Sequence, residues 1–141
     1  MIVDDNYLSA EGIEKNIDWE TLNAEIIHVC YNGTSAIEAM KKEPADLIIS
    51  DIEMPDLDGI SMSRQALEIN PMVKIILISA YDKFEYARRA LLLGALDYIE
   101  KPLDYAYLIQ KVKNAFALME KEQKNLQLLK QSRPLLTEKF F

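Results

Sequence analysis

The sequence predicts an α/β fold: a doubly wound parallel sheet of five strands that alternate with five helices. Short apolar runs alternate with helical patterns along most of the 141 residues, and strands joined through helices run parallel in one sheet. The runs at residues 47–50 and 75–78 are continuously apolar, which is typical of strands covered on both faces. Hydrophobic residues make up 50% of the chain, enough for one domain with an ordinary core.

The predicted elements follow one another in strict alternation. We expect strands at residues 2–3, 24–30, 47–51, 73–79 and 97–100. We expect one helix with Leu8, Ile13 and Ile17 on a shared face, and further helices at residues 35–42, 60–69, 84–93 and 103–130.

Proline and glycine mark the ends of three of these helices. Pro44 and Pro71 restrict the residue before them, and Gly94 suits a helix C-terminus. The first strand has only two residues before its acids, whereas strands usually run about 5–6 residues. We therefore expect that residues upstream were removed or that Met1 reflects where the chain was cut.

Composition narrows the function classes. Residues 1–100 carry 19 acidic and 8 basic side chains, so this part is expected to attract cations and repel nucleic acid. The single cysteine, Cys30, lies in an apolar run and predicts a buried thiol rather than a disulfide, which fits a reducing compartment. The start MIVDDN does not resemble a signal peptide, and no apolar run approaches the ~18 residues of a membrane span. We expect a soluble cytoplasmic protein.

Polar side chains stand at successive strand ends. Asp4 and Asp5 follow the first strand, Asp51 ends the third, Ser79 ends the fourth and Lys101 follows the fifth. In an open parallel sheet, ligands bind beyond these carboxyl ends. Clustered carboxylates favour Mg²⁺, and the lysine adds a positive charge for an anionic guest. The set predicts a site for a phosphoryl group and a magnesium ion.

Each of these residues also has a structural interpretation. An Asp pair after a strand is commonly a turn or a helix cap, and a strand-end serine or a lone lysine is commonly a surface group. Asp56, Asp58 and Gly59 are typical of a turn that leads into a helix. The functional interpretation therefore depends on the polar residues falling together on successive strand ends.

The motifs together resemble one family. They are IVDD at 2–5, SDIEMPDLDG at 50–59, ISA at 78–80 and GALDYIEKP at 94–102. From Ile2 to about Lys130, the chain resembles the receiver domain of two-component response regulators. The resemblance implies a flavodoxin-like fold with strand order 2-1-3-4-5.

The resemblance also implies roles at the site. Asp51 would be the phosphoacceptor, and Mg²⁺ or Mn²⁺ would be bound by Asp5, Asp51 and the backbone carbonyl of Glu53, with Asp4 acting through water. Lys101 would neutralise a phosphoryl oxygen. The domain would catalyse its own phosphotransfer and dephosphorylation, and would not be an enzyme with a separate substrate.

Further residues are implied around the site. Ser79 would be the switch hydroxyl that bonds the phosphoryl group, and Tyr98 the aromatic side chain that moves with it. Glu53 and Tyr81 would tune the lifetime of the phosphate, and the bond before Pro102 would be cis. For Tyr98, a half-buried strand aromatic is the structural alternative.

The ends of the chain suggest the partners. NIDWETLNAEI and the segment from SAYDKF to EKPLD resemble regulators with an AraC-type DNA-binding output domain. We expect a receiver domain at 1–118 and an extended helix and linker at 119–141, with DNA contacted only through an output domain outside this chain. A sensor histidine kinase would be the phosphodonor.

The last helix carries an apolar seam with coiled-coil spacing. Its positions alternate by four and three: Leu108, Val112, Ala115, Met119, Glu122, Leu126 and Leu129. We expect the helix to be free from about Met119 onward and to form a parallel dimer contact at 119–136, or else to remain a single exposed helix. A dimer through the fourth and fifth helices, using Arg88, Arg89, Asp97 and Asp104, is the alternative.

Other functions remain open at this point. The domain could stand alone or control a non-DNA output. A haloacid-dehalogenase-like phosphatase also uses an aspartyl phosphate, but it wants a second Asp where this chain has Glu53. A flavodoxin-like cofactor binder would need a phosphate loop after the first strand, where this chain has acids.

Overall fold

The computed structural model has one parallel sheet of five strands in the order β2-β1-β3-β4-β5, which confirms the predicted fold class. The structure describes residues 1–80 and 84–140, with side chains for all of these except residues 84 and 132–140. The strands are β1 (Ile2–Val3), β2 (Val29–Cys30), β3 (Leu47–Asp51), β4 (Lys74–Ser79) and β5 (Asp97–Glu100). The helices are α1 (Tyr7–Asn16), the 3₁₀ helix η1 (Glu20–Leu22), α2 (Gly33–Lys42), α3 (Gly59–Ile69), α4 (Phe84–Leu93) and α5 (Tyr105–Phe140).

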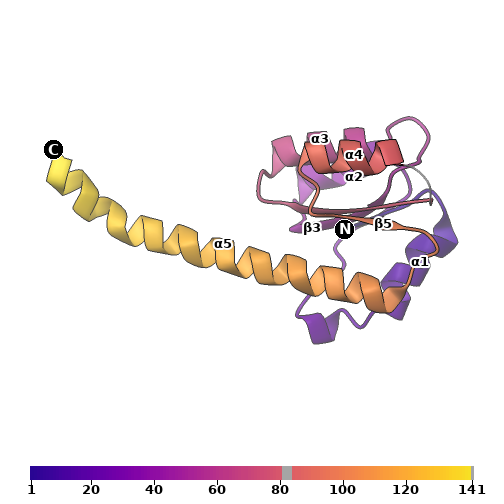
Figure 1. Cartoon of the computed structure of the whole chain (residues 1–141), viewed down its shortest axis with the longest axis horizontal. Helices are drawn as coiled ribbons and strands as arrows, with labels where there is room; N and C mark the ends of the chain where they lie inside the picture. Colours follow the sequence, from indigo (N-terminus) through magenta and orange to yellow (C-terminus); the bar gives the residue numbers. More distant parts are fainter. Residues whose placement is uncertain (81–83, 141) are drawn as a thin grey trace.

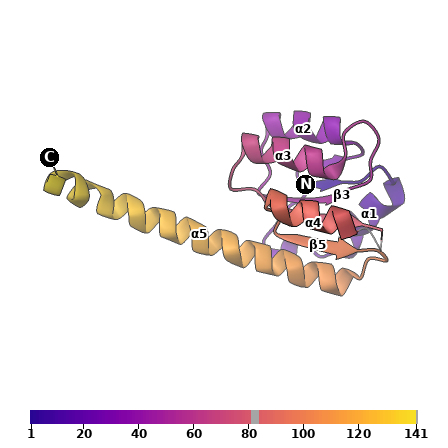
Figure 2. The ribbon, with the colours of Figure 1, turned by 45° about the horizontal axis from the view of Figure 1, so that its top comes forward.

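Helices cover both faces of the sheet. Helices α2, α3 and α4 lie on one face, and α1 and α5 lie on the other (Figures 1 and 2). Side chains alternate between two cores: Ile48 and Leu77 point towards α2–α4, whereas Ile49 and Ile76 point towards α1 and α5. This burial on both faces is why residues 47–49 of β3 and 75–78 of β4 are continuously apolar.

Short polar side chains cap the N-termini of the helices that follow the strands. The side chain of Asn6 accepts hydrogen bonds from the first turn of α1, and Asn32 and Asp58 do the same for α2 and α3. Asp104 accepts from the backbone N–H of Ala106 at the start of α5, at 2.9 Å. Such caps satisfy backbone donors that have no partner within the helix, and they set where each helix begins.

The predicted second strand is too long. Only Val29–Cys30 is a strand, because β1 offers partners only through Ile2 and Val3. Residues 24–28 precede the strand without ladder pairing. The apolar pattern of residues 24–28 therefore reflects partial burial beside the sheet rather than strand pairing.

The predicted inner face of the first helix is partly wrong. Ile13 and Ile17 are buried together with Ala10, but Leu8 is 80% exposed. Positions 10, 13 and 17 are spaced by three and four residues and share one helical face, which position 8 does not join.

The last helix begins at Tyr105 and continues to Phe140. It crosses one face of the sheet and then projects well beyond the domain (Figure 1). The prediction that it is free from Met119 onward is wrong, because Met119 packs against the core and Glu122 pairs with Lys74 of β4. In the described part of the chain, no helix is long and apolar enough to cross a membrane.

Candidate functional site

Three carboxylates meet where β1 and β3 end. Asp4, Asp5 and Asp51 each place a carboxylate oxygen within 4.8 Å of the others. Strands β1 and β3 are neighbours in the sheet, with Val3 paired to Ser50, so the residues that follow them lie side by side. Asp4 and Asp51 are buried and Asp5 is exposed, which leaves the cluster open to solvent on one side. An oxygen cluster of this size matches the donors that hard divalent cations prefer.

Lys101 brings one positive charge to these acids. Its Nζ lies 3.0 Å from Asp51 Oδ2 and donates a hydrogen bond to it. Burial lowers the pKa of Lys101, but the hydrogen bond to Asp51 and the charges of the three acids outweigh burial and raise it above its usual value. The lysine therefore remains an ammonium, and it opposes three carboxylates with a single charge.

Asp4 occupies the least solvated position of the cluster. Burial raises its pKa from 3.8 to about 6, and the charge of Asp51 adds to this effect. A hydrogen bond from the backbone N–H of Asn6 to Asp4, 2.9 Å long, acts in the opposite direction. Excess negative charge in a partly dry site is unfavourable without a cation, and this favours metal binding.

The loop from β3 to α3 packs closely against the end of β3. A Cβ atom at Gly59 would collide with the backbone carbonyl of Asp51, so α3 can begin this close to the site only with glycine. The N–H of Gly59 donates to the carbonyl of Ile52 at 2.8 Å. Asp56 has a left-handed backbone (φ 68°) and Asp58 caps α3. The predicted turn and helix-entry interpretation of these two acids is confirmed.

Ser79 ends β4 inside the domain, beside the acids. Its side chain is fully buried, and its Oγ makes no hydrogen bond of good geometry to the described residues. Tyr98, on β5, is half-buried; burial raises its pKa, and it is close enough to Ser79 for their hydroxyls to interact. A buried hydroxyl without an aligned partner can donate a hydrogen bond to a phosphoryl oxygen.

The remaining predicted site residues have different outcomes. Glu53 follows β3 by two positions and its side chain is exposed, with its charge acting on Tyr98. The Lys101–Pro102 peptide bond is cis, the form that the resemblance implies. Tyr81 lies outside the described residues.

Sequence reasoning missed several contacts between distant segments. The rings of Tyr7 and Tyr31 pack at a tilt of 39° with their centroids 4.1 Å apart, which joins the start of α1 to the residue after β2. Lys111 of α5 pairs with Asp97 at 3.1 Å and lies over the ring of Tyr107. No spacing in the sequence reveals the Tyr pair or the Lys111–Asp97 pair, because each joins residues brought together only by the fold.

Comparison with known proteins identifies relatives. Residues 1–113 match the family described as the response regulator receiver domain. The chain is 28% identical over 122 residues to an uncharacterized transcriptional regulatory protein, YesN, of Bacillus subtilis (strain 168). That match covers 86% of this chain and 33% of YesN, so the chain spans about a third of this relative's length.

Two solved structures are also similar. One is the REC domain of AraT, a response regulator from Geobacillus stearothermophilus, with 34% identity and a TM-score of 0.81. The other is a two component transcriptional regulator AraC from Clostridium phytofermentans ISDg, with 31% identity and a TM-score of 0.80. Each match covers 86% of this chain and 95% of the other. With its acids gathered at the ends of β1 and β3, the chain belongs to the response regulator receiver domain family.

Proposed function

We propose that this chain is the phosphorylation-controlled input domain of a transcriptional regulator, and that Asp51 accepts the phosphoryl group. The observation that carries the proposal is the cluster of Asp4, Asp5 and Asp51 with Lys101 Nζ 3.0 Å from Asp51. Three acids with one ammonium leave net negative charge at a site open to solvent. Such a site is suited to a cation and a phosphoryl group together.

The proposed reaction is transfer from a phosphohistidine of a sensor histidine kinase. A carboxylate oxygen of Asp51 attacks phosphorus in line, the P–N bond breaks, and the imidazole leaves with the electron pair. Lys101 stays beside Asp51 and neutralises one phosphoryl oxygen. The protein contributes position and charge rather than acid–base chemistry, as is usual for phosphoryl transfer. We place this reaction in the cytoplasm.

The acidic cluster fits Mg²⁺, or Mn²⁺ in its place. Asp5, Asp51 and the backbone carbonyl of Glu53 would bind the ion directly, and Asp4 would act through water. A bound cation would screen the phosphoryl oxygens from the attacking carboxylate. The CheX-CheY-BeF3-Mg+2 complex from Borrelia burgdorferi, whose similarity to this chain is 30% identity and a TM-score of 0.71, supports this assignment.

The switch would lie in Ser79 and Tyr98. The hydroxyl of Ser79 is buried without an aligned hydrogen-bond partner among the described residues, so a phosphoryl oxygen would supply one. Movement of Ser79 towards Asp51 would change its interaction with Tyr98 and rearrange this face. Glu53 and Tyr81 would tune how fast the acyl phosphate hydrolyses in the domain's own dephosphorylation.

The output would lie beyond this chain, with residues 1–118 as the receiver and 119–141 leading to a DNA-binding domain. We propose a homodimer through α5 beyond Glu122, where Leu126 is 45% exposed. On the alternative face of α4 and α5, two of the four charges already have partners within the chain, since Arg88 pairs with Glu85 and Asp97 with Lys111. Sedimentation of the protein with and without beryllofluoride tests this, and a monomer in both conditions would refute the homodimer.

The phosphoacceptor is tested by incubating the protein with Mg²⁺ and acetyl phosphate, then measuring its intact mass. We expect one added phosphoryl group on the wild type and none on Asp51→Asn. Asp58→Asn is the matched control, because it removes a charge from the same loop while asparagine can still cap α3. Labelling of Asp51→Asn at the wild-type level would refute the assignment.

A further inference from the structure

Helix α5 is held against the sheet by an apolar stripe that ends in a carboxylate. Leu108, Val112 and Ala115 are fully buried, and Met119 packs against the same core. These positions are spaced by four, three and four residues, so they share one face. The next position of this face is Glu122, where the pattern calls for another apolar residue.

Glu122 is not directed into solvent. The Nζ of Lys74 lies 2.8 Å from both Oε1 and Oε2 of Glu122. The side chain of Lys74 is 14% exposed and that of Glu122 is 29% exposed. Lys74 is the first residue of β4, so the pair joins the N-terminal edge of the sheet to the helix.

A second ion pair on the same helix provides the contrast. Glu120 pairs with Lys124 at 3.5 Å, with both side chains at least 70% exposed. That pair lies within one helix and is open to salt and water, so it has little effect on how the helix sits on the domain. The Lys74–Glu122 pair instead joins two elements that are 48 residues apart in the chain.

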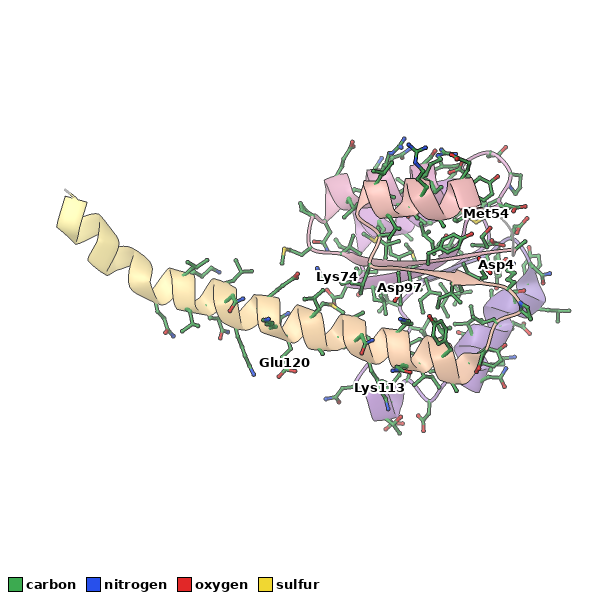
Figure 3. The ribbon with its side chains drawn as sticks, viewed as in Figure 1. Asp4, Met54, Lys74, Asp97, Lys113 and Glu120 are labelled. Carbon is green, nitrogen blue, oxygen red and sulfur yellow. The ribbon has the colours of Figure 1, made fainter. Side chains whose placement is uncertain are left out.

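The contact with the domain ends near Glu122. Figure 3 shows Lys74 at the end of the sheet above α5, and the helix continuing beyond the domain. Leu126, the next residue of the inward face, is already 45% exposed. From Glu122 to Phe140 the helix extends about 27 Å at its usual rise, so a small change of angle at Glu122 moves its far end by several ångströms.

We propose that the Lys74–Glu122 ion pair fixes the direction in which α5 leaves the domain, and with it the placement of everything attached beyond residue 122. This positioning role goes beyond the proposed phosphotransfer and does not rest on it. Both partners are positioning residues that touch no reacting atom.

The chemistry of the pair explains why it can select one arrangement. An apolar residue at position 122 would lengthen the stripe but would tolerate small shifts of the helix. A carboxylate that is paired with one ammonium does not tolerate shifts of the helix. Sliding α5 by one turn, about 5.4 Å, would leave both charges partly buried and unpaired. The pair therefore supplies specificity of position.

The test measures the direction of the helix in the complete chain. Nitroxide labels at Lys42→Cys on α2 and Leu128→Cys on α5, in a Cys30→Ala background, report one distance distribution by pulsed electron resonance. We expect a narrow distribution for the parent protein, and a distribution at least twice as broad for Glu122→Lys and for Lys74→Glu. The charge swap Lys74→Glu/Glu122→Lys should restore the narrow distribution.

The control is Glu120→Lys, which makes the same charge change in the exposed pair and should leave the distribution narrow. Hydrogen exchange at residues 119–126 should become faster in the two single variants and recover in the swap. Thermal melts show whether each variant is folded, and Glu122→Gln replaces any single variant that is not. A parent-like distance distribution in folded variants with the pair broken would overturn the proposal.

Discussion

The two edges of the sheet each hold a lysine–carboxylate pair, and the pairs differ in how their charge is balanced. At the C-terminal edge, Lys101 lies 3.0 Å from Asp51, with Asp4 and Asp5 beside it. At the N-terminal edge, Lys74 lies 2.8 Å from Glu122. Figure 3 shows Asp4 and Lys74 at opposite ends of the domain.

The N–O distances in the two pairs are similar, but the number of acids around each lysine differs. Lys74 neutralises one carboxylate, so its pair is balanced in charge and suited to holding two elements together. Lys101 faces three carboxylates, so its site keeps net negative charge and gains from a further cation. An unbalanced cluster at the ends of parallel strands indicates binding and chemistry, whereas a balanced pair indicates architecture.

The largest expected effect is the loss of phosphorylation in Lys101→Met, for which Lys74→Met is the matched comparison. Lys101→Met removes the ammonium that faces the phosphoryl group, and the phosphorylation rate of Asp51 should fall about 10²–10³-fold. Lys74→Met should leave this rate within about twofold, because electrostatic effects on a reaction require charge at the reacting atoms. Rates are measured with acetyl phosphate and saturating Mg²⁺; equal losses in the two variants would contradict the distinction between the edges.

Gly59 and Gly94 lie at opposite ends of the strands and allow a second comparison of the two ends of the sheet. Gly59→Ala places a Cβ against the carbonyl of Asp51, and we expect a loss of about 2–3 kcal/mol in the free energy of unfolding. Gly94, between α4 and β5, has a φ of 100° and open space around it, so Gly94→Ala should cost only about 1 kcal/mol of backbone strain. Urea unfolding of both variants provides the measurement, and a reversed order would show that space does not limit Gly59.

The raised pKa of Asp4 should make the free energy of unfolding depend on pH. Its pKa is raised to about 6 in the folded protein, so the folded state holds a proton that the unfolded chain loses above its usual value near 4. Without Mg²⁺, this group therefore makes the protein more stable as the pH falls from 7 to 5. Asp4→Asn should raise the free energy of unfolding at pH 7 by about 1–2 kcal/mol and flatten this dependence.

Added Mg²⁺ provides the control for Asp4. A cation favours the ionised acid, so Mg²⁺ should stabilise the wild type at pH 7 and do so less at pH 5. Denaturation curves with Mg²⁺ or with a chelator check both expectations. A wild type that is less stable at pH 5 than at pH 7 with the chelator present, while Asp4→Asn behaves in the same way, would show that Asp4 is not the group responsible.

The smallest expected effect is at Asp56, in the loop of the C-terminal edge. Its φ of 68° suits glycine, so Asp56→Gly should change the free energy of unfolding by less than about 1 kcal/mol. The phosphorylation rate should be retained, because this acid lies outside the cluster formed by Asp4, Asp5 and Asp51. A loss of phosphorylation comparable to that of Lys101→Met would place Asp56 in the site.

Residue pattern predicted the parallel sheet, the alternation of strands and helices, and the polar residues that stand at the strand ends. The apolar runs at 47–50 and 75–78 report burial on both faces, which the chain encodes locally, and parallel strands necessarily bring their carboxyl ends to one edge. The gathering of Asp4, Asp5 and Asp51 beside Lys101 was therefore predictable, and the structure has it.

Tertiary structure decided what depends on partners distant in the chain. The strand predicted at 24–30 shortened to Val29–Cys30 because its neighbour β1 offers pairing partners only at Ile2 and Val3. The sequence placed Glu122 as an interruption of a helical seam, but only the fold brings it to Lys74. Periodicity records which face of a segment is apolar, whereas the partner of a charged group depends on how the whole chain packs.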